Sequence, residues 1–300
     1  MKTLLILGAS GFFGKSLIDY AKNYGLKKWS IDKVILVSRR KIDLKKNIKK
    51  IKIIHLRKEI KKIKYLPKAN YIFYFINEKN QKKSLESFKK FNSLIKNIKD
   101  KTSILFASSG AVYGLIKNKK DTIESKKINT IKIAKFNNYK KKYALNKYKM
   151  EKKFKKIKNK KLNISILRCF TFIGKEIIMR KQYAISDFIN SVKNKNKIEV
   201  QKPLSVRSYM HSIDLSEWLL TIAIKSNSLY QIVNVGSDQE INMKNLSKRI
   251  SKKYARNSKV FLKANEERDY YVPNIQKAKT KFRLRNRFSI DKSLDDILNI

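Results

Sequence analysis

The stretch Leu4-Leu5-Ile6-Leu7-Gly8-Ala9-Ser10-Gly11-Phe12-Phe13-Gly14 decides the fold of this 300-residue chain. Four apolar residues predict a buried strand, and three glycines spaced by three follow it, although the whole chain has only 8 glycines. Glycine suits positions that need a positive φ or the close approach of another group to the backbone. A strand, a glycine turn and a helix start together direct backbone N–H groups at a phosphate. The alternative is an ordinary strand-to-helix turn, because a glycine triplet alone is a weak signal.

Composition limits the class of protein. The length and an apolar fraction of 42% allow one large α/β domain, or one domain with a smaller lobe. No stretch approaches 18 uninterrupted apolar residues, so we expect no membrane span. A single cysteine, Cys169, excludes an internal disulfide and favours a cytoplasmic location. With one cysteine and 2 histidines, we expect no zinc site.

The formal net charge of +50 raises the question of a nucleic-acid partner. The 73 basic residues comprise 61 Lys and only 12 Arg, and the lysines run through the whole sequence. Surfaces that clamp phosphates or read bases favour Arg and interleaved aromatic residues. We therefore interpret the lysines as solvated surface and expect no nucleic-acid partner. The charge should still speed the association of polyanionic ligands at low salt.

Apolar strands alternate with helices along the first half of the chain. The predicted strands are Thr3–Leu7, Val34–Val37, Ile51–Ile54, Tyr71–Ile76, Ser103–Ala107 and Asn163–Leu167, and the predicted helices are Lys15–Tyr24, Phe88–Ile98 and Tyr143–Phe154. Strands that are apolar throughout favour a parallel sheet covered on both faces. We expect a doubly wound, Rossmann-type α/β domain over 1–170, completed by a strand near 230–236. Residues 171–300 would mainly form a smaller substrate-binding lobe, and 115–142 a long surface loop.

The residues after the predicted second strand bear on the cofactor. In dinucleotide-binding units an acidic residue there holds the ribose 2′-hydroxyl, whereas an Arg accommodates a 2′-phosphate. This chain has Ser38-Arg39-Arg40-Lys41 and no Asp or Glu at that point. The pattern favours NADP(H), with Arg39 as the leading contact, Arg40 beside it and Ser38 as an added donor. NAD(H) is the alternative, because cations are common everywhere in this chain.

Tyr143 and Lys147 form the candidate catalytic pair. Their i, i+4 spacing places a phenol and an ammonium on one helix face. Spacing alone proves little, since the chain holds four Tyr-x-x-x-Lys matches. Context selects this pair, which lies downstream of Ser108-Ser109-Gly110-Ala111-Val112-Tyr113-Gly114. That segment ends the predicted fifth strand, and open α/β sheets bind their ligands at such strand ends.

Further motifs occur in a familiar order over nearly the whole chain. They are Glu151 after the Tyr143/Lys147 pair, Leu167–Gly174, Arg207–His211 before Asp214, Asn234–Ser237, and Tyr271-Val272-Pro273. Together with the glycine turn, they resemble an extended short-chain dehydrogenase/reductase of the NAD-dependent epimerase/dehydratase family. Members of that family modify nucleotide sugars, so the resemblance implies a nucleotide-diphosphate sugar as substrate. It also implies a homodimer.

The resemblance assigns roles to the matching catalytic positions. Tyr143 would be the general acid/base, Lys147 would bind the nicotinamide ribose and hold the phenolate, and Ser109 would hydrogen-bond the reacting sugar oxygen. Physical chemistry supports the pairing, since a phenol of pKa near 10 must drop about three units, or about 4 kcal/mol, to work near neutrality. One cation at about 4 Å supplies about that much at an effective dielectric of 20.

The remaining candidate residues divide between cofactor and substrate. The cofactor side comprises Gly8, Ser10, Gly11, Phe12, Phe13, Gly14 and Phe75, with Tyr143 and Lys147. On the substrate side, Arg207 is a candidate diphosphate clamp, because a guanidinium fork suits phosphate; the alternative is a surface ion pair. Tyr209 or Tyr271 would contact the nucleotide or the sugar. We interpret His211 as a packed histidine rather than a catalyst.

Departures from the family pattern narrow the function. Gly110 and Ala111 stand where the 4,6-dehydratases carry an acidic pair, which disfavours dehydration. The third strand ends in His55-Leu56-Arg57 without the usual Gly-Asp, and Phe75-Ile76-Asn77 replaces small alanines. We expect NADPH-dependent reduction of a 4-keto-6-deoxy nucleotide sugar. The alternatives are a nucleotide-sugar 4-epimerase with tightly bound cofactor and, as a third hypothesis, a non-catalytic basic binding protein.

Overall fold

The computed structural model describes residues 2–44, 51–78, 80–178, 183–195, 197–254, 258–265 and 267–298. Its internal contacts divide the chain into two compact units. The sheet unit comprises Met1–Val112, Phe136–Arg168 and Ser216–Val233, and the second unit comprises Tyr113–Lys135, Cys169–Leu215 and Asn234–Ile300.

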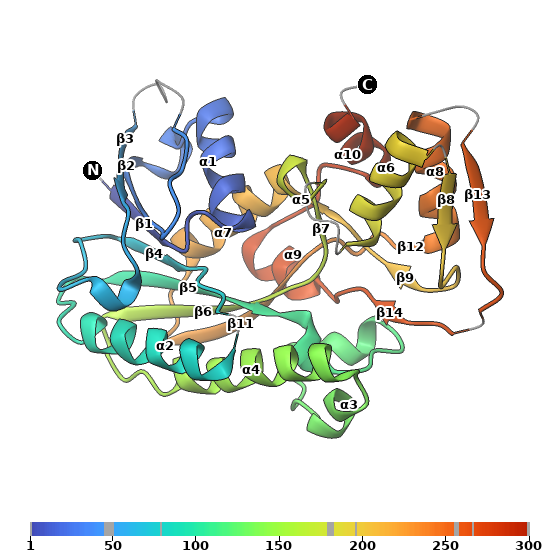
Figure 1. Cartoon of the computed structure of the whole chain (residues 1–300). Helices are drawn as coiled ribbons and strands as arrows, with labels where there is room; N and C mark the ends of the chain where they lie inside the picture. Colours follow the sequence, from blue (N-terminus) through green and yellow to red (C-terminus); the bar gives the residue numbers. More distant parts are fainter. Residues whose placement is uncertain are drawn as a thin grey trace. The chain divides into compact units, whose positions relative to one another are not determined.

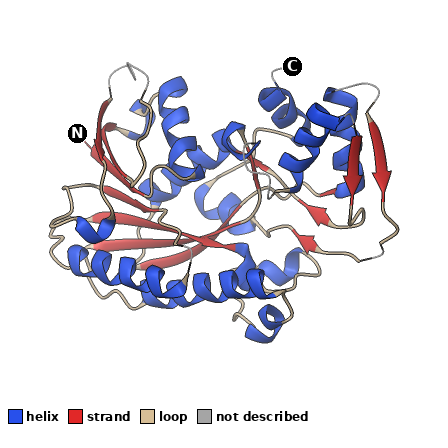
Figure 2. Cartoon of the chain, in the orientation of Figure 1, coloured by secondary structure: helices blue, strands red, loops and turns tan. Residues whose placement is uncertain are grey.

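A seven-stranded parallel sheet has the order β11-β6-β5-β4-β1-β2-β3 (Figures 1 and 2). Its strands are β1 (Lys2–Leu7), β2 (Ile31–Val37), β3 (Lys52–Leu56), β4 (Tyr71–Tyr74), β5 (Thr102–Ser109), β6 (Leu162–Cys169) and β11 (Tyr230–Val235). The order of the first six strands is that of dinucleotide-binding sheets. The predicted Rossmann-type α/β fold is confirmed.

Helices cover both faces of this sheet, with α1 and α7 on one face and α2 and α4 on the other (Figure 1). They are α1 (Phe12–Tyr24), α2 (Gln81–Ile95), α4 (Asn138–Lys155) and α7 (Ser212–Lys225), joined by the short 3₁₀ helices η1 (Lys27–Trp29), η2 (Ile60–Lys62) and η3 (Gly110–Tyr113). On the α1 face, the hydroxyl of Tyr20 donates to Glu217 Oε1 at 2.8 Å and ties α1 to α7.

The core between the sheet and helices α2 and α4 is aromatic. Phe106 of β5 stacks on Phe154 of α4 with ring centroids 4.3 Å apart. Tyr74 of β4 packs on Phe91 of α2 at 4.8 Å and on Phe154 at 5.4 Å. All four rings are almost completely buried. Aromatic pairs of this kind contribute roughly 0.5–1.5 kcal/mol each beyond their buried area, so they fix both helices on the sheet.

The ends of β4, β1 and β2 meet at one edge of the sheet. β1 pairs in parallel with β2, Leu7 opposite Val37, and with β4, Leu7 opposite Tyr74. The chain after β1, the glycine turn, therefore lies between the segments that follow β2 and β4. Here the strand order reverses direction, and open α/β sheets bind ligands at such a point.

Two helices begin earlier than their apolar spacing predicts. The helix predicted from Phe88 begins at Gln81, and the helix predicted from Tyr143 begins at Asn138. In each case an asparagine caps the start: Asn80 Oδ1 accepts from the backbone N–H of Lys83, and Asn137 Oδ1 from that of Lys140, both at 2.9 Å. The first turns are lysine-rich and solvated, so they carry a capping signal but no apolar periodicity.

Residues 115–142 are not the long surface loop that their charges predict. The segment contains η4 (Lys119–Thr122), α3 (Thr130–Ala134) and the start of α4. Asn118 and Asn129 accept backbone hydrogen bonds at 2.9 Å at the starts of η4 and α3. Thr122 and Ile133 are fully buried. Asparagine-led turns bury Ile116, Ile128 and Ile133, whereas most lysines of the segment are exposed.

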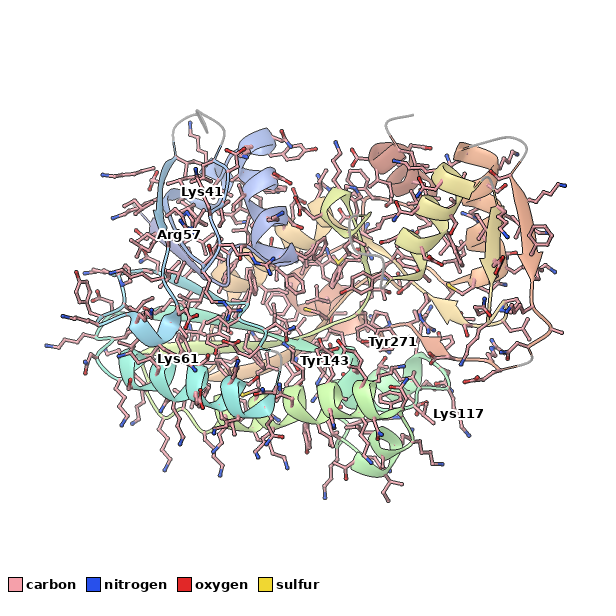
Figure 3. The ribbon with its side chains drawn as sticks, in the orientation of Figure 1. Lys41, Arg57, Lys61, Lys117, Tyr143 and Tyr271 are labelled. Carbon is pink, nitrogen blue, oxygen red and sulfur yellow. The ribbon has the colours of Figure 1, made fainter. Side chains whose placement is uncertain are left out.

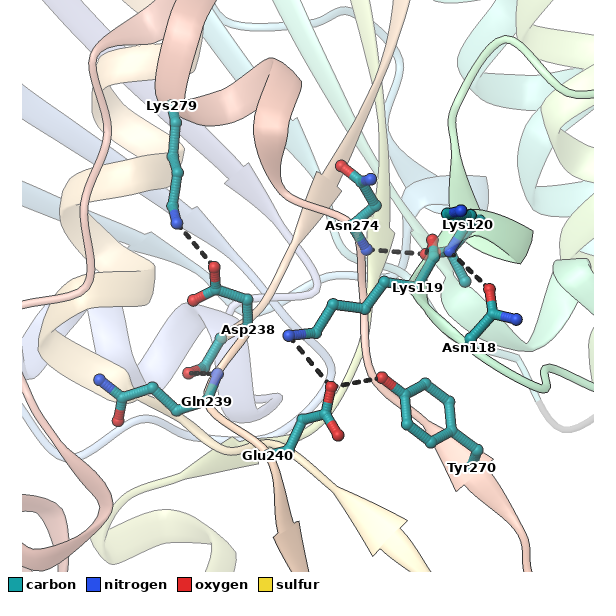
Figure 4. Close-up of polar contacts among 11 residues, drawn as sticks. Asn118, Lys119, Lys120, Asp238, Gln239, Glu240, Tyr270, Asn274 and Lys279 are labelled. Atoms are coloured by element: carbon teal, nitrogen blue, oxygen red, sulfur yellow. Dashed lines mark hydrogen bonds and ion pairs between the residues drawn. The ribbon is translucent and has the colours of Figure 1, made fainter.

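Asn234 anchors this segment within the second unit. Its Oδ1 accepts from the hydroxyl of Tyr113 at 2.9 Å, and its Nδ2 donates to the carbonyl oxygen of Thr122 at 2.6 Å. Its backbone N–H donates to buried Glu124 at 2.9 Å. Figure 4 shows the neighbouring contacts, in which Lys119 and Tyr270 both reach Glu240, and the N–H of Asn274 reaches Thr122.

The rest of the second unit combines short strands with helices. Its strands are β7 (Phe172–Ile173), β8 (Lys197–Val200), β9 (Val206–Arg207), β10 (Met210–His211), β12 (Ile241–Asn242), β13 (Lys259–Leu262) and β14 (Tyr270–Tyr271). Its helices are α5 (Lys175–Ile178), α6 (Ala184–Lys195), α8 (Met243–Tyr254), α9 (Gln276–Phe282) and α10 (Ile290–Leu298). Within the described residues, no helix has the length and apolar character needed to cross a membrane.

A buried charge cluster joins α4 to the sheet. Arg168 of β6 donates to both carboxylate oxygens of Glu151 on α4, at 3.1 and 2.9 Å. The hydroxyl of Ser108, on β5, donates to Glu151 Oε1 at 2.6 Å. Both charged side chains are at most 2% exposed. The carboxylate is therefore surrounded by donors, as an ion buried this deeply requires.

We expect Glu151→Ala to lower the free energy of unfolding by about 3–5 kcal/mol, because it leaves Arg168 as an uncompensated buried charge. The double variant Glu151→Met, Arg168→Met removes both charges and should recover most of that loss. Urea denaturation measures both effects. Glu199→Ala is the control, since its ion pair with Lys197 is about half exposed and should contribute less than about 1 kcal/mol. Equal losses in Glu151→Ala and in the control would contradict the assignment.

Candidate functional site

The glycine turn after β1 has two glycines that the protein itself requires. Gly8 has a φ of +86°, and a Cβ there would lie 2.8 Å from the carbonyl carbon of Phe75. A Cβ on Gly14 would overlap the backbone of Ala9. Gly11 differs, because its φ is −82° and a Cβ would meet only the Gly8 carbonyl oxygen, at 3.3 Å. Packing within the protein therefore explains Gly8 and Gly14, but hardly explains Gly11.

The start of α1 fits the phosphates of a dinucleotide. Gly11 is the N-cap of this 13-residue helix, no side chain caps the helix, and its first turn has no acidic residue. The backbone N–H groups and the positive end of the helix dipole attract an anion at such a terminus. Phe12 is buried in the core, whereas the ring of Phe13 packs on that of Phe75, with centroids 5.2 Å apart. Ser10 is half-buried in the turn.

Two carboxylates approach Arg39 after β2. Its Nη1 lies 3.9 Å from Glu59 Oε1 and 3.8 Å from Glu78 Oε2. The side chain of Arg39 is 62% exposed, whereas that of Glu78 is 12% exposed. Residues 38–41, directly after β2, include no acid, but the fold brings two carboxylates to Arg39 from the segments after β3 and β4. The next two residues, Arg40 and Lys41, are exposed (Lys41 is labelled in Figure 3).

Ser38 is buried and already engaged. Its hydroxyl donates to the carbonyl oxygen of Arg40 at 2.6 Å and lies 2.9 Å from His55 Nε2. A hydroxyl has one proton, so His55 is the donor in the second contact. Burial, with a smaller contribution from Arg57, lowers the pKa of His55 and favours the neutral ring. Ser38 can therefore donate to a cofactor only if its hydroxyl turns away from Arg40.

Tyr143 and Lys147 share one face of α4, as predicted. Lys147 is 7% exposed, and its ammonium donates to the carbonyl oxygen of Ala107 on β5 at 2.9 Å. The same nitrogen lies 5.9 Å from the ring centroid of Tyr143 (labelled in Figure 3) and 5.6 Å from that of Phe106. The positive charge is thus fixed beside the phenol at the carboxyl end of β5. Such a charge stabilises a phenolate and eases proton transfer.

Ser109 ends β5 and leads into η3. Its Oγ accepts the backbone N–H of Ala111 at 3.2 Å, which orients the hydroxyl oxygen. Ser109 and Ala111 are both buried. At this position neither Gly110 nor Ala111 brings an acidic group to the end of the strand.

A small pocket of about 10 Å³, room for about one water molecule, lies beside Lys147 within the sheet unit. It is lined by Tyr74, Ile76, Asn77, Glu78, Ser84, Phe106, Asn146, Lys147 and Met150. Asn146 donates from Nδ2 to Ser84 Oγ at 2.9 Å, and its buried Oδ1 has no hydrogen-bond partner among the described residues. Buried polar atoms are rarely left unpaired, so this oxygen can accept a hydrogen bond from a donor as small as a water molecule.

Of the predicted substrate residues, Ser109 lies in the sheet unit, whereas Arg207, Tyr209 and Tyr271 lie in the second unit. Tyr271 of β14 is the register partner of Arg207 on β9, and the guanidinium carbon lies 6.0 Å from the tyrosine ring centroid. Arg207 is held by Asp269, with Nη2 2.6 Å from Oδ2 and Nη1 2.7 Å from the carbonyl oxygen. The ring of Tyr271 also packs on Phe170, at 4.7 Å. Burial raises the pKa of the Tyr209 phenol, which is 7% exposed.

Comparison with protein families now identifies the chain. A model of the NAD dependent epimerase/dehydratase family matches residues 4–236, which include the glycine turn, Tyr143 and Lys147. The chain belongs to this family. It is an enzyme of the extended short-chain dehydrogenase/reductase type, as the motifs predicted. A comparison with curated protein sequences finds no match.

Solved structures share the fold at low sequence identity. MoeE5 in complex with UDP-glucose and NAD is 16% identical, with a TM-score of 0.75 over 99% of this chain and 97% of that chain. dTDP-glucose 4,6-dehydratase from Bacillus anthracis, in complex with NAD, is 14% identical, with a TM-score of 0.75 over 100% and 96%. UDP-glucose 4-epimerase from Bifidobacterium longum, with NAD+ and UDP, is 16% identical, with a TM-score of 0.75 over 99% and 97%.

Sequence reasoning missed several polar groups of this family member. Glu78 lies four residues after the end of β4, so the rule that ligands bind at carboxyl strand ends could have found it. Glu59 and Asp269 lie on irregular segments with no local signal. Asn146 lies inside the Tyr-x-x-x-Lys motif. The i, i+4 spacing that selects Tyr143 and Lys147 does not select Asn146, because it is the residue immediately before Lys147. In the described part of the chain, no group of three or more metal-ligating side chains gathers.

Two alanine variants separate the roles of the glycines. Gly14→Ala should lower the free energy of unfolding by about 2 kcal/mol or more, because the new Cβ overlaps the backbone. Gly11→Ala should cost less than about 1 kcal/mol, yet weaken dinucleotide binding at least about tenfold, because the middle glycine admits the pyrophosphate. Thermal denaturation and calorimetric titration with NAD+ and NADP+ measure the two effects. Unchanged cofactor affinity in Gly11→Ala would overturn the assignment of the turn.

Proposed function

We propose that this enzyme reduces the 4-keto group of a 4-keto-6-deoxy nucleotide sugar with NADPH. The observation that carries the proposal is the buried ammonium of Lys147, fixed by Ala107 and 5.9 Å from the Tyr143 ring centroid. A fixed cation beside a phenol equips that phenol to exchange a proton with a sugar oxygen. The glycine turn and the open start of α1 fit a dinucleotide on the same edge of the sheet.

A dinucleotide held at the glycine turn would supply the hydride for this chemistry. Tyr143 gives its phenolic proton to the oxygen of the ketone, so that the carbonyl becomes a secondary alcohol. Lys147 stabilises the resulting phenolate until a proton from solvent restores the phenol. Ser109, oriented by the N–H of Ala111, hydrogen-bonds the reacting oxygen. The carbonyl thus gains one hydride and one proton, and no bond of the sugar ring is broken.

The end of β5 supports reduction over dehydration. Elimination of water from the sugar needs a further acid and base beside the carbons that lose the proton and the hydroxyl. Gly110 and Ala111 supply neither group. Transfer of one hydride and one proton needs only the cofactor with Ser109, Tyr143 and Lys147.

Arg207 and Tyr271 are the proposed contacts of the nucleotide diphosphate. Asp269 holds one edge of the guanidinium, which fixes its plane, and a planar fork suits bidentate binding of phosphate. Tyr271 offers a ring that is anchored on Phe170. Tyr209 is the more deeply buried of the two predicted tyrosines, and its contact with the substrate stays a prediction, as do the homodimer and the cytoplasmic location.

A 4-epimerase is the second candidate. It is favoured by Glu59 and Glu78, whose carboxylates lie within 4 Å of Arg39 and so reduce the positive charge available to a 2′-phosphate. The Bifidobacterium longum neighbour is a UDP-glucose 4-epimerase with NAD+ and UDP. An epimerase returns its hydride to the sugar and consumes no reductant. Membership of an enzyme family sets aside the third hypothesis, a non-catalytic basic binding protein.

Cofactor consumption distinguishes the two candidates. With a 4-keto-6-deoxy nucleotide sugar, we expect one NADPH to be oxidised for each product formed, followed by the loss of absorbance at 340 nm and by product chromatography. Interconversion of an unoxidised sugar nucleotide with no NADPH consumed would overturn the reductase and establish the epimerase.

Tyr143→Phe should lower kcat at least about 100-fold, because the proton donor at the reacting oxygen is lost. Lys147→Met should lower it comparably and also weaken cofactor binding. The chain offers a matched control on the same helix, since Tyr148 and Lys152 repeat the spacing, with the ammonium 4.5 Å from the ring centroid. Tyr148→Phe should leave kcat within about twofold of the unchanged enzyme. Full activity in Tyr143→Phe would contradict the proposal.

A further inference from the structure

Glu78 lies where the dinucleotide-binding edge of the sheet meets Arg39. It follows β4, which pairs with β1, and Arg39 follows β2 on the other side of β1. The two side chains reach across the glycine turn, and Nη1 of Arg39 lies 3.8 Å from Glu78 Oε2. An Arg at this point accommodates the 2′-phosphate of NADP(H), whereas an acidic residue accepts from the 2′-hydroxyl of NAD(H). This chain has both groups at one place.

Glu78 is the fixed member of the pair. Its Oε1 accepts the hydroxyl of Ser87 on α2 at 3.0 Å, and Ser87 is completely buried. The glutamate side chain is 12% exposed, and the guanidinium opposite is 62% exposed. Glu59, the other carboxylate near Arg39, is 43% exposed and contacts the guanidinium at 3.9 Å. Arg39 can therefore turn toward a phosphate in solvent, but the charge of Glu78 stays where it is.

We propose that Glu78 determines the choice between NADP(H) and NAD(H) by opposing the 2′-phosphate at Arg39. The inference rests on the proposed function in one respect, namely that Arg39 faces the adenosine ribose. A phosphate bound to Arg39 shares this guanidinium with Glu78, and the two anions repel each other. A 2′-hydroxyl carries no charge and can donate to a carboxylate. Glu78 thus weakens NADP(H) selectively, and Arg39 strengthens it.

The size of the effect follows from Coulomb's law. Two anions that touch opposite sides of one guanidinium are within about 8 Å of each other, and the phosphate carries a charge of about −1.5 to −2. At that separation, even the dielectric constant of water allows a repulsion that changes affinity about fivefold. Salt screens the interaction between partly exposed charges, so the effect should shrink as ionic strength rises.

Calorimetric titration of the full chain with NADP+ and with NAD+ tests the proposal. Glu78→Gln removes the charge and keeps an oxygen that can accept from Ser87. We expect the Kd for NADP+ to fall about fivefold and the Kd for NAD+ to stay within about twofold. Glu86→Gln is the matched control, because Glu86 pairs with Lys61 at 2.5 Å rather than with Arg39, and it should change neither Kd by more than about twofold.

Two further variants keep the outcomes distinct. Arg39→Ala should weaken NADP+ at least about tenfold and spare NAD+. Glu59→Gln should move the ratio of the two Kd values in the same direction as Glu78→Gln, by about twofold. This variant replaces Glu78→Gln as the test of the carboxylates if Glu78→Gln lowers the Tm. If neither Glu78→Gln nor Glu59→Gln changed the ratio of the Kd for NADP+ to the Kd for NAD+, the role of the carboxylates would be overturned, and the proposed function would not be affected. If the unaltered chain bound neither cofactor, the proposed function itself would fail.

Discussion

The buried ion pair between Glu151 and Arg168 is the constraint on which the candidate site depends. Tyr143, Lys147 and Glu151 follow one another at intervals of four along α4, so they form one stripe on the helix. Arg168 of β6 and Ser108 of β5 bind Glu151, the C-terminal residue of this stripe. These contacts fix the rotation of α4 about its own axis. Lys147 then reaches the Ala107 carbonyl from the same face. The position of the phenol is thus determined by a charge pair that takes no part in the chemistry.

The fold was predictable because its main signals are local. Strands buried on both faces have apolar sequences, and the two glycines that packing requires lie close in sequence, Gly8 at the end of β1 and Gly14 in the first turn of α1. The starts of α2 and α4 and the segment 113–135 were not predictable from apolar spacing, because their signal is a capping asparagine within lysine-rich sequence. Asn234 then joins that segment to the end of β11 through hydrogen bonds with residues more than 100 positions away. No window of the sequence contains both partners.

The candidate site divides in the same way. The glycine turn and the Tyr143/Lys147 pair are contiguous motifs, so sequence alone could point to them. The carboxylates that pair with the two predicted arginines come from other segments: Glu78, after β4, approaches Arg39, and Asp269, before β14, pairs with Arg207. Inspecting only the residues after β2 gave an incomplete account of the charge at Arg39. In a parallel sheet the ends of neighbouring strands have to be considered together, because they form one edge.

The acidic residues are therefore more informative than the basic ones in this chain. With 73 basic and 23 acidic residues, a lysine or arginine near any ligand is expected by composition alone. A carboxylate that is held in one place is less expected. Glu151 is held by a buried arginine, and Glu78 is oriented by the hydroxyl of Ser87. In a site with many cations, the positions of the few carboxylates determine where a phosphate binds, because each carboxylate repels a phosphate placed near it.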